Sequence, residues 1–231
     1  MREEWRRKVV MIWKGWGLSL LSAILIATSF KSAIADWYNV PSGSMLPTIL
    51  IGDRVFVNKL AYDLKFPYTT LQLVKWSAPK RGDIVVFLSP QDGTRLIKRV
   101  VGLPGDTIAM QDDRLLINGR FVHYGPLEKR IVDQIDRTEQ AQYVFFSENL
   151  PGRQHAVVFT PSRPCRDSFR AMNVPDRKYF MMGDNRDNSA DSRFFGLVDR
   201  KFVVGRTTMV VISREGSFLH PRWDRFFEDL S

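Results

Sequence analysis

The chain has 231 residues, of which 44% are hydrophobic and 26% charged, a composition that excludes both wholesale disorder and a polytopic membrane protein. Lysine and arginine outnumber aspartate and glutamate by 34 to 25, so the surface should attract an anionic partner, either nucleic acid or lipid headgroups. The single cysteine, Cys165, rules out an intrachain disulfide, and the three isolated histidines do not have the spacing of a zinc site.

The first predicted element is an apolar segment, residues 9–35, which follows a basic segment, residues 1–8. Its uncharged stretch runs from Gly15 to Phe30 between two lysines. Because the aliphatic stems of lysines can lie in hydrocarbon, they extend this stretch toward the roughly 20 apolar residues of a spanning helix. The basic flank then predicts a single-pass transmembrane helix with its N-terminus in the cytoplasm and the rest of the chain exported.

A cleaved signal peptide is the alternative for this segment. Ala33-Ile34-Ala35 has the small residues of a signal-peptide cleavage site and follows a basic and then an apolar region. Lys31 interrupts the approach to that site, which favours the anchor. Both interpretations export the body of the chain.

Beyond Trp37 the sequence predicts short strands. Asp53–Lys59 alternates apolar and polar residues, Ile84–Leu88 is a continuous apolar run, and Asn118-Gly119 is a strong hairpin signal. The other predicted strands are Leu96–Val101, Leu115–Ile117, Arg120–Tyr124, Gln142–Phe146, Ala156–Thr160, Tyr179–Met182 and Phe202–Ile212. No helix-period segment of any length occurs between residues 37 and 215, so we expect a mainly β fold with antiparallel sheets.

Residues 107–176 are more polar than their flanks, which predicts a second lobe inserted into a β core formed by residues 36–106 and 177–231. A set of surface loops on a single domain is the alternative for this region. At the C-terminus, four apolar residues at helical spacing predict a short amphipathic helix: Trp223, Phe226, Phe227 and Leu230.

Three segments carry candidate chemistry: VPSGSMLPTILIGDRVFVNK at 40–59, KRGDIVVF and LIKRVVGLPGD within 80–106, and GDNRDNSADSRFFG at 183–196. Taken singly, a serine in a turn or a lysine on a strand is usually structural. No histidine lies near the candidate serines in sequence, whereas a serine beside a small residue and a lysine in an apolar strand can form a Ser-Lys dyad. The acidic run at 183–196 does not match a calcium loop. Counted from Asp187, the twelfth position is Val198, where a calcium loop needs a bidentate glutamate.

These segments, in this order, resemble bacterial type I signal peptidases, the membrane-anchored serine proteases that remove signal peptides from exported preproteins. The resemblance covers nearly the whole chain apart from residues 107–176. It implies that Ser44 is the nucleophile, Lys98 the general base and Ser189 the hydroxyl that orients the lysine. It also implies that Ser42 and the backbone N–H of Ser44 form the oxyanion hole.

The same resemblance implies two structural ion pairs and two substrate pockets. It pairs Arg99 with Asp184 and Asp191 with Arg193. Two shallow apolar pockets would accept the small side chains at the first and third positions before the cut, and the residues expected to floor them are Val40 and Ile97.

The expected base makes a strong demand on its surroundings. A lysine acts as a base only when neutral, and lowering its pKa from about 10.4 to near 7 requires roughly 4–5 kcal/mol of destabilisation of the ammonium. Desolvation is the effect large enough to supply this. Alternation along the strand places Lys98 on one face with Leu96 and Val100, and Arg99 on the opposite face.

The resemblance thus predicts a serine endopeptidase of the bacterial cytoplasmic membrane, with its catalytic domain outside the cytoplasm. Its expected partners are preproteins and membrane phospholipids, close to the protein export machinery, with no nucleic acid, cofactor or metal. A self-cleaving repressor would also use a serine and a lysine, but it needs an N-terminal helix-turn-helix, and residues 1–36 offer an apolar segment instead. A binding protein on an inactive protease scaffold predicts loss of the serine or the lysine, and both are present.

Overall fold

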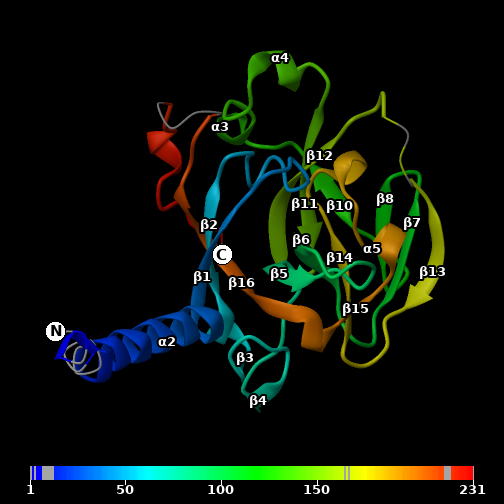
Figure 1. The fold of residues 1–231 in the computed structure, drawn as a ribbon. Helices are drawn as coiled ribbons and strands as arrows, with labels where there is room; N and C mark the ends of the chain where they lie inside the picture. The colour runs from blue at the N-terminus through cyan, green and yellow to red at the C-terminus, as the bar shows by residue number, and fades with distance from the viewer. Residues whose placement is uncertain are drawn as a thin grey trace.

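The computed structural model describes residues 2, 4–6, 13–163, 165, 167–215 and 220–230. Antiparallel β-sheets are the main regular structure of the described chain (Figure 1), which confirms the expected mainly β fold. The helical elements are η1 (Trp13–Gly17), α2 (Leu18–Ala33), η2 (Lys59–Ala61), α3 (Lys129–Val132), α4 (Arg137–Gln140), η3 (Arg186–Asn188), α5 (Ser192–Phe195), η4 (Arg200–Phe202) and η5 (Trp223–Arg225).

A seven-stranded sheet occupies the centre of the molecule. Its strands lie in the order β1 (Ala35–Asn39), β2 (Arg54–Asn58), β16 (Val203–Ile212), β5 (Ile84–Leu88), β6 (Arg95–Gly102), β14 (Lys178–Met182) and β15 (Val198–Asp199). Every neighbouring pair in this sheet is antiparallel. The chain therefore places β6, which carries Lys98, between β5 and β14.

Both faces of this sheet are covered, which explains the continuous apolar run in β5. Ile84 and Val86 pack into one core cluster, and Val85 and Phe87 pack into another on the opposite face. Successive residues of a strand point to opposite faces, so a strand buried on both sides must be apolar at every position. The predicted strand 84–88 is confirmed, and its pairing with β6 fixes the register of Lys98 opposite Val85.

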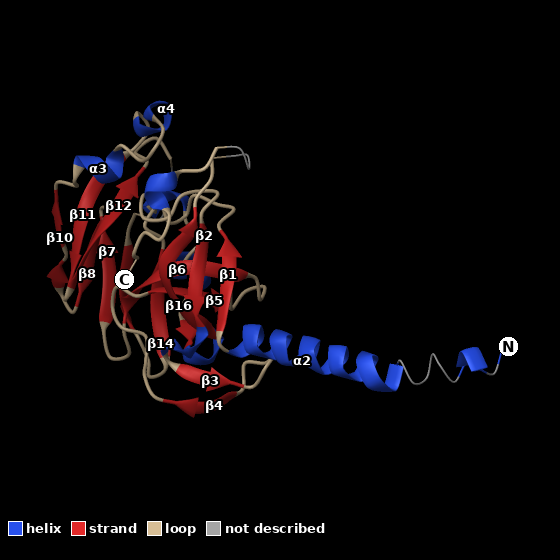
Figure 2. Ribbon diagram, turned by 90° about the vertical axis from the view of Figure 1, so that its left-hand side faces the viewer, coloured by secondary structure: helices blue, strands red, loops and turns tan. Residues whose placement is uncertain are grey.

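Three smaller sheets complete the fold. They contain β3 (Asp63–Lys65) with β4 (Gln72–Lys75); β13 (Phe169–Asn173), β7 (Thr107–Gln111), β8 (Arg114–Ile117) and β9 (Arg120–Phe121); and β10 (His123–Gly125), β11 (Val144–Leu150) and β12 (Arg153–Phe159). The four-stranded and three-stranded sheets lie on the side of the large sheet away from α2 (Figures 1 and 2). They are joined to it by a shared apolar core in which Ile108 and Leu115 cluster with Phe180 and Met182.

The structure confirms most predicted strands within a few residues and corrects one. The Asn118-Gly119 hairpin forms, with both residues at positive φ, and it pairs Ile117 with Arg120. The predicted strand Arg120–Tyr124, however, divides into β9 and β10, which belong to different sheets. The break falls at Val122, whose side chain is buried and whose backbone N–H bonds to Leu115.

At the N-terminus, α2 projects from the β body as a separate rod (Figure 2). It holds 16 residues, and no helix in the described part of the chain has both the length and the hydropathy to cross a membrane. The predicted basic segment 1–8 and spanning segment 9–35 lie partly outside the described residues, since residues 1, 3 and 7–12 are not described.

The predicted C-terminal helix is wrong. Only the single turn η5 forms, and Trp223 and Phe227 remain largely exposed. The chain after η5 pairs with β16 instead: the N–H of Leu230 donates to the carbonyl of Thr208, and the N–H of Val210 donates to Glu228. Tertiary pairing with β16 thus outcompetes a helix too short to be stable alone.

Candidate active site

Ser44 lies in the loop between β1 and β2, and a buried polar contact stabilises the base of this loop. The N–H of Val40 donates to the carbonyl of Asp53, and the Asp53 carboxylate accepts the N–H of Leu50 at 2.9 Å. The loop buries several apolar side chains, namely Met45, Leu46, Ile49 and Leu50. Ser44 itself is partly exposed and Ser42 is exposed, so the loop presents both serines at its accessible side.

Lys98 reaches this loop from the centre of the large sheet. Its Nζ lies 2.7 Å from Ser44 Oγ and 3.0 Å from the carbonyl oxygen of Ile97. The lysine is only 3% exposed. Its neighbours on the strand follow the predicted alternation, because Leu96 and Val100 pack in one apolar cluster while Ile97 packs in another.

Burial controls the charge of this lysine. Desolvation lowers the pKa of Lys98 to about 8 from its ordinary value of 10.5, and Arg193 contributes in the same direction. The carboxylates of Asp191 and Asp184 act against this shift by favouring the ammonium. The neutral amine is therefore accessible near neutral pH, in a group that already contacts a serine hydroxyl.

Ser189 lies beside the same loop. Its Oγ is buried and has no hydrogen-bond partner among the described residues. A Cβ on Gly183 would overlap both Ser189 Oγ and the carbonyl oxygen of Ser44, so the absence of a side chain at Gly183 lets the two serines approach. The atoms that crowd Gly183 thus all belong to Ser189 and Ser44.

Two buried ion pairs flank the lysine. Arg99 donates from Nε and Nη2 to the two oxygens of Asp184, at 2.8 and 2.6 Å, and Thr48 donates its hydroxyl to the same carboxylate. Arg193 pairs in the same bidentate way with Asp191, with both distances 2.9 Å. The structure therefore brings together the four charged residues that the sequence analysis paired.

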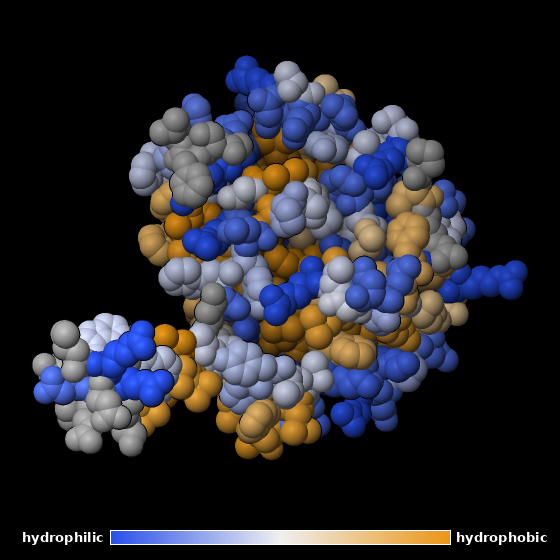
Figure 3. Space-filling model, in the orientation of Figure 1, coloured by the Kyte–Doolittle hydropathy of each residue, from blue (hydrophilic) through white to orange (hydrophobic). Residues whose placement is uncertain are grey.

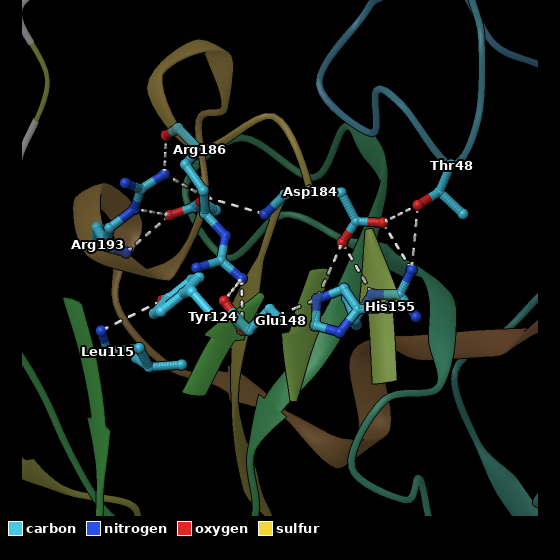
Figure 4. Close-up of polar contacts among 11 residues, drawn as sticks. Thr48, Leu115, Tyr124, Glu148, His155, Asp184, Arg186 and Arg193 are labelled. Carbon is cyan, nitrogen blue, oxygen red and sulfur yellow. Dashed lines mark hydrogen bonds and ion pairs between the residues drawn. The ribbon is translucent and has the colours of Figure 1, made fainter. Parts of the chain in front are cut away.

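A second layer of charge was not found from the sequence. Arg186 pairs with Glu148 of β11 at 2.5 Å, and His155 of β12 lies between two carboxylates (Figure 4). Its Nε2 is 3.8 Å from both Glu148 and Asp184. Burial, together with nearby arginines, holds the pKa of His155 well below its ordinary value, so this histidine is neutral at neutral pH.

One further contact connects the serine loop to the C-terminal end of the described chain. Arg225, almost fully buried, donates to the Asp53 carboxylate at 2.7 Å and to the carbonyl of Thr48 at 3.1 Å. No local pattern around Arg225 points to a partner 172 positions earlier. From the sequence alone, only Asp53 stands out, as a carboxylate directly before strand β2, and nothing identifies Arg225 as its partner.

Val40 and Ile97 share one apolar cluster, which also includes Tyr38 and Met45. Val40 is 5% exposed and Ile97 is partly buried, and their cluster adjoins the dyad along the chain, because Ile97 precedes Lys98 and Met45 follows Ser44. Across the described residues, no group of three or more histidine, cysteine or carboxylate side chains is placed to hold a metal ion.

Comparison with known proteins gives consistent matches. The family model described as signal peptidase, peptidase S26 matches residues 13–212. Signal peptidase I of Buchnera aphidicola subsp. Schizaphis graminum is 35% identical, covering 85% of this chain and 74% of the relative. Signal peptidase I of Pseudomonas aeruginosa is 34% identical, covering 86% and 72%. The crystal structure of a signal peptidase I from Enterococcus faecalis is 32% identical over 56% of this chain and 97% of that chain, with a TM-score of 0.34.

The Arg99–Asp184 pair generates a stability prediction. Asp184→Asn leaves a buried guanidinium without its carboxylate, which typically lowers the free energy of unfolding by about 3–5 kcal/mol. We expect a clearly lower urea midpoint, measured by tryptophan fluorescence of the protein in nonionic detergent. Asp224→Asn, at an exposed position in η5, is the matched control and should leave the midpoint unchanged. Equal midpoints for the two variants would contradict a stabilising role for the buried pair.

Proposed function

The chain belongs to the signal peptidase family, peptidase S26, and removes signal peptides from preproteins; we propose that Ser44 is the nucleophile of this cleavage and Lys98 its general base. The observation that carries the proposal is the 2.7 Å contact between Lys98 Nζ and Ser44 Oγ, made by a lysine that is 3% exposed. A serine hydroxyl is a weak nucleophile until a base accepts its proton. Lys98 is the basic group in contact with that hydroxyl.

The proposed reaction begins with neutral Lys98. With a pKa of about 8, roughly a tenth of the molecules carry the neutral amine at pH 7. The amine accepts the proton of Ser44 while Oγ attacks the scissile carbonyl carbon, and the resulting ammonium then protonates the leaving amine. Water deacylates the enzyme by the same steps, with Lys98 again accepting a proton.

We assign the oxyanion hole to the N–H of Ser44 and the hydroxyl of Ser42. Both serines lie on the accessible side of a loop whose base is fixed by Asp53, so their donors need little rearrangement when the substrate binds. Ser189 is proposed to orient Lys98. Its buried hydroxyl lacks a partner among the described residues and lies against Ser44, where an amine could use it as a hydrogen-bond partner.

Substrate selection is assigned to Val40 and Ile97. A peptide bound as an extended strand directs its first and third residues before the cut toward the same side. The shared apolar wall of Val40 and Ile97 beside the dyad suits two shallow pockets for small side chains. This assignment is tested by mapping the positions at which an Ile97→Ala variant cuts a set of preproteins.

We further propose that residues 9–35 anchor the protein in the bacterial cytoplasmic membrane, with residues 1–8 in the cytoplasm and the catalytic domain outside. In support, α2 stands apart from the β body and carries exposed apolar side chains on all sides, among them Leu18, Leu20, Leu21, Ile24, Leu25 and Ile26. Figure 3 shows the apolar surface of this helix beside that of the β3–β4 hairpin below it. Interaction with phospholipids and with the export machinery follows from this location.

The β3–β4 hairpin supports a membrane contact of the catalytic domain. Its exposed residues include Phe66, Tyr68, Leu71, Leu73, Val74 and Trp76. The N–H of Tyr68 donates to Ser32 of α2 at 2.8 Å, so the hairpin lies at the end of the proposed anchor. Aromatic and aliphatic side chains at this level suit the boundary between hydrocarbon and headgroups.

We also assign residues 36–106 and 177–231 to the catalytic core and residues 107–176 to an inserted lobe, because they supply different sheets.

The dyad assignment predicts the effect of two substitutions. Ser44→Ala and Lys98→Ala should each abolish preprotein cleavage without changing the urea midpoint greatly, and the double variant should be scarcely worse than either single one. Ser42→Ala and Ser189→Ala should be milder, with losses of about 10²–10³ in kcat for an oxyanion donor. The measurement is cleavage of a preprotein, with products located by mass spectrometry. Retained activity of Lys98→Ala would require a different base.

The lowered pKa of Lys98 predicts the pH dependence of the reaction. Because the neutral amine is the active form, kcat/KM should rise with pH and level off above an apparent pKa near 8, the value set by burial. A profile measured between pH 6 and 10.5 decides this. A rise confined to the region near pH 10 would show that the free enzyme does not desolvate its lysine.

The anchor proposal predicts that the protein stays in the membrane fraction after a carbonate wash. Leu21→Arg combined with Leu25→Arg should release it, because each arginine at a helix centre costs roughly 2.5–3.5 kcal/mol on insertion scales. Phe121→Arg, at an exposed position of the β body, is the control and should not release it. Mass analysis that finds Asp36 as the first residue would instead establish a cleaved signal peptide.

A further inference from the structure

Apart from the proposed active site, a pocket of about 420 Å³ lies on the sheets formed by residues 107–173. Three aromatic side chains line it, Tyr124, Phe146 and Phe159, together with three carboxylates, Asp112, Asp113 and Asp187. Its lining includes neither Ser44 nor Lys98, and the proposed peptidase reaction makes no use of it. The combination of aromatic walls with carboxylates restricts the chemistry of what it can hold.

The three rings form a connected wall. Their centroids lie 6.1 Å apart for Tyr124 and Phe146, 6.2 Å for Tyr124 and Phe159, and 5.9 Å for Phe146 and Phe159, and the rings meet edge to face. An aromatic ring carries negative potential over its face. Such walls attract a cation with an apolar stem and offer nothing to an anion.

The carboxylates strengthen this preference. Asp112 and Asp113 form the tip of the β7–β8 hairpin, where both residues have positive φ. The Oδ1 atom of Asp113 is buried and has no hydrogen-bond partner within the described ranges. Burial and the nearby carboxylates of Asp187 and Asp167 raise the pKa of Asp113, and Arg193 and Arg186 only partly offset this rise. A cation in the pocket would supply the missing partner.

Three described arginines, Arg114 in the lining and Arg186 and Arg193 near Asp113, each have a partner outside the pocket lining. Arg114 also lines the pocket, but its guanidinium carbon lies 4.3 Å from the ring centroid of Phe121. Arg186 is fully buried and pairs with Glu148, and Arg193 pairs with Asp191. The pocket thus combines three carboxylates with one lining arginine, in a chain whose net charge is +9.

We propose that this pocket binds an alkylammonium group, carried by the lysine side chain of a partner polypeptide. The four-carbon stem of a lysine would cover the rings of Phe146 and Phe159, and its ammonium would pair with Asp113 and its neighbours. Val144 and Pro161 at the rim are exposed, so a side chain can enter while its backbone stays at the surface. A compact ammonium on a flexible stem suits a pocket whose carboxylates come from separate loops.

The experiment titrates the full chain, in nonionic detergent, with N-acetyl-lysine methylamide and follows the heat of binding. We expect saturable binding in the millimolar range, with the uncharged norleucine analogue bound at least tenfold more weakly. Asp113→Asn should weaken lysine binding about tenfold, the loss expected for one charge-assisted contact. Asparagine tolerates positive φ, so this substitution removes charge without straining the hairpin.

The matched control is Asp176→Asn, an exposed carboxylate near the opposite end of β7, which should bind lysine as the unsubstituted protein does. Phe146→Leu tests the rings and should weaken the lysine compound severalfold more than the norleucine analogue. The same titration with n-butylammonium compares a free amine with a peptide-borne one. If n-butylammonium binds more weakly than the lysine compound, the result supports a polypeptide partner. If it binds more tightly, the proposal of a polypeptide partner is overturned. Equal affinity for the norleucine analogue, equal loss in Asp176→Asn, or no saturable binding would overturn the cation site.

Discussion

The burial of Lys98 is the constraint on which the proposed active site depends. A buried ammonium is stabilised strongly by any carboxylate that it can reach, and Asp184 and Asp191 both lie close enough to raise its pKa. In the structure each of these carboxylates is paired bidentately with an arginine, and no ion pair to Lys98 occurs within the part of the chain that is described. The two arginines therefore compensate charge that would otherwise keep the lysine protonated. The ion pairs support catalysis in the proposed mechanism without touching the reacting atoms.

β11 and β12 hold the segment that carries Ser189. The N–H of Val158 in β12 donates to the carbonyl of Asp184 at 2.9 Å, and the N–H of Thr160 donates to the Asp187 carboxylate. Side-chain pairing adds to these backbone contacts, because Arg186 of η3 pairs with Glu148 of β11. The segment from residue 184 to 189 is thus fixed on one side by the large sheet and on the other by β11 and β12. The buried Glu148 of β11 is tolerated in this setting, since it has a charged partner across the interface.

The sequence predicted those features that local pattern determines. Alternation identified β2, the apolar run identified β5, and Asn118-Gly119 identified a hairpin because few residues tolerate its positive φ values. The motifs singled out Ser44 and Lys98, and the structure brings their side chains into contact. Partners chosen through space were predicted only where the family motifs supplied them, as for Arg99 and Asp184. The pairs Glu148–Arg186 and Asp53–Arg225 have no local signal. The prediction of a C-terminal helix was wrong for the same reason, because pairing with β16 decides the conformation of residues 228–230.

The distribution of charge gives the net basicity a physical meaning. Five of the described arginines are buried, and each forms an ion pair with a buried carboxylate: Arg99 with Asp184, Arg186 with Glu148, Arg193 with Asp191, Arg200 with Asp63 and Arg225 with Asp53. These pairs are neutral in sum, so they add nothing to the net charge of +9. The excess must therefore reside mainly on groups closer to solvent, where it acts at long range on anionic surfaces. In the membrane location proposed above, that attraction would hold the catalytic domain near the lipid headgroups.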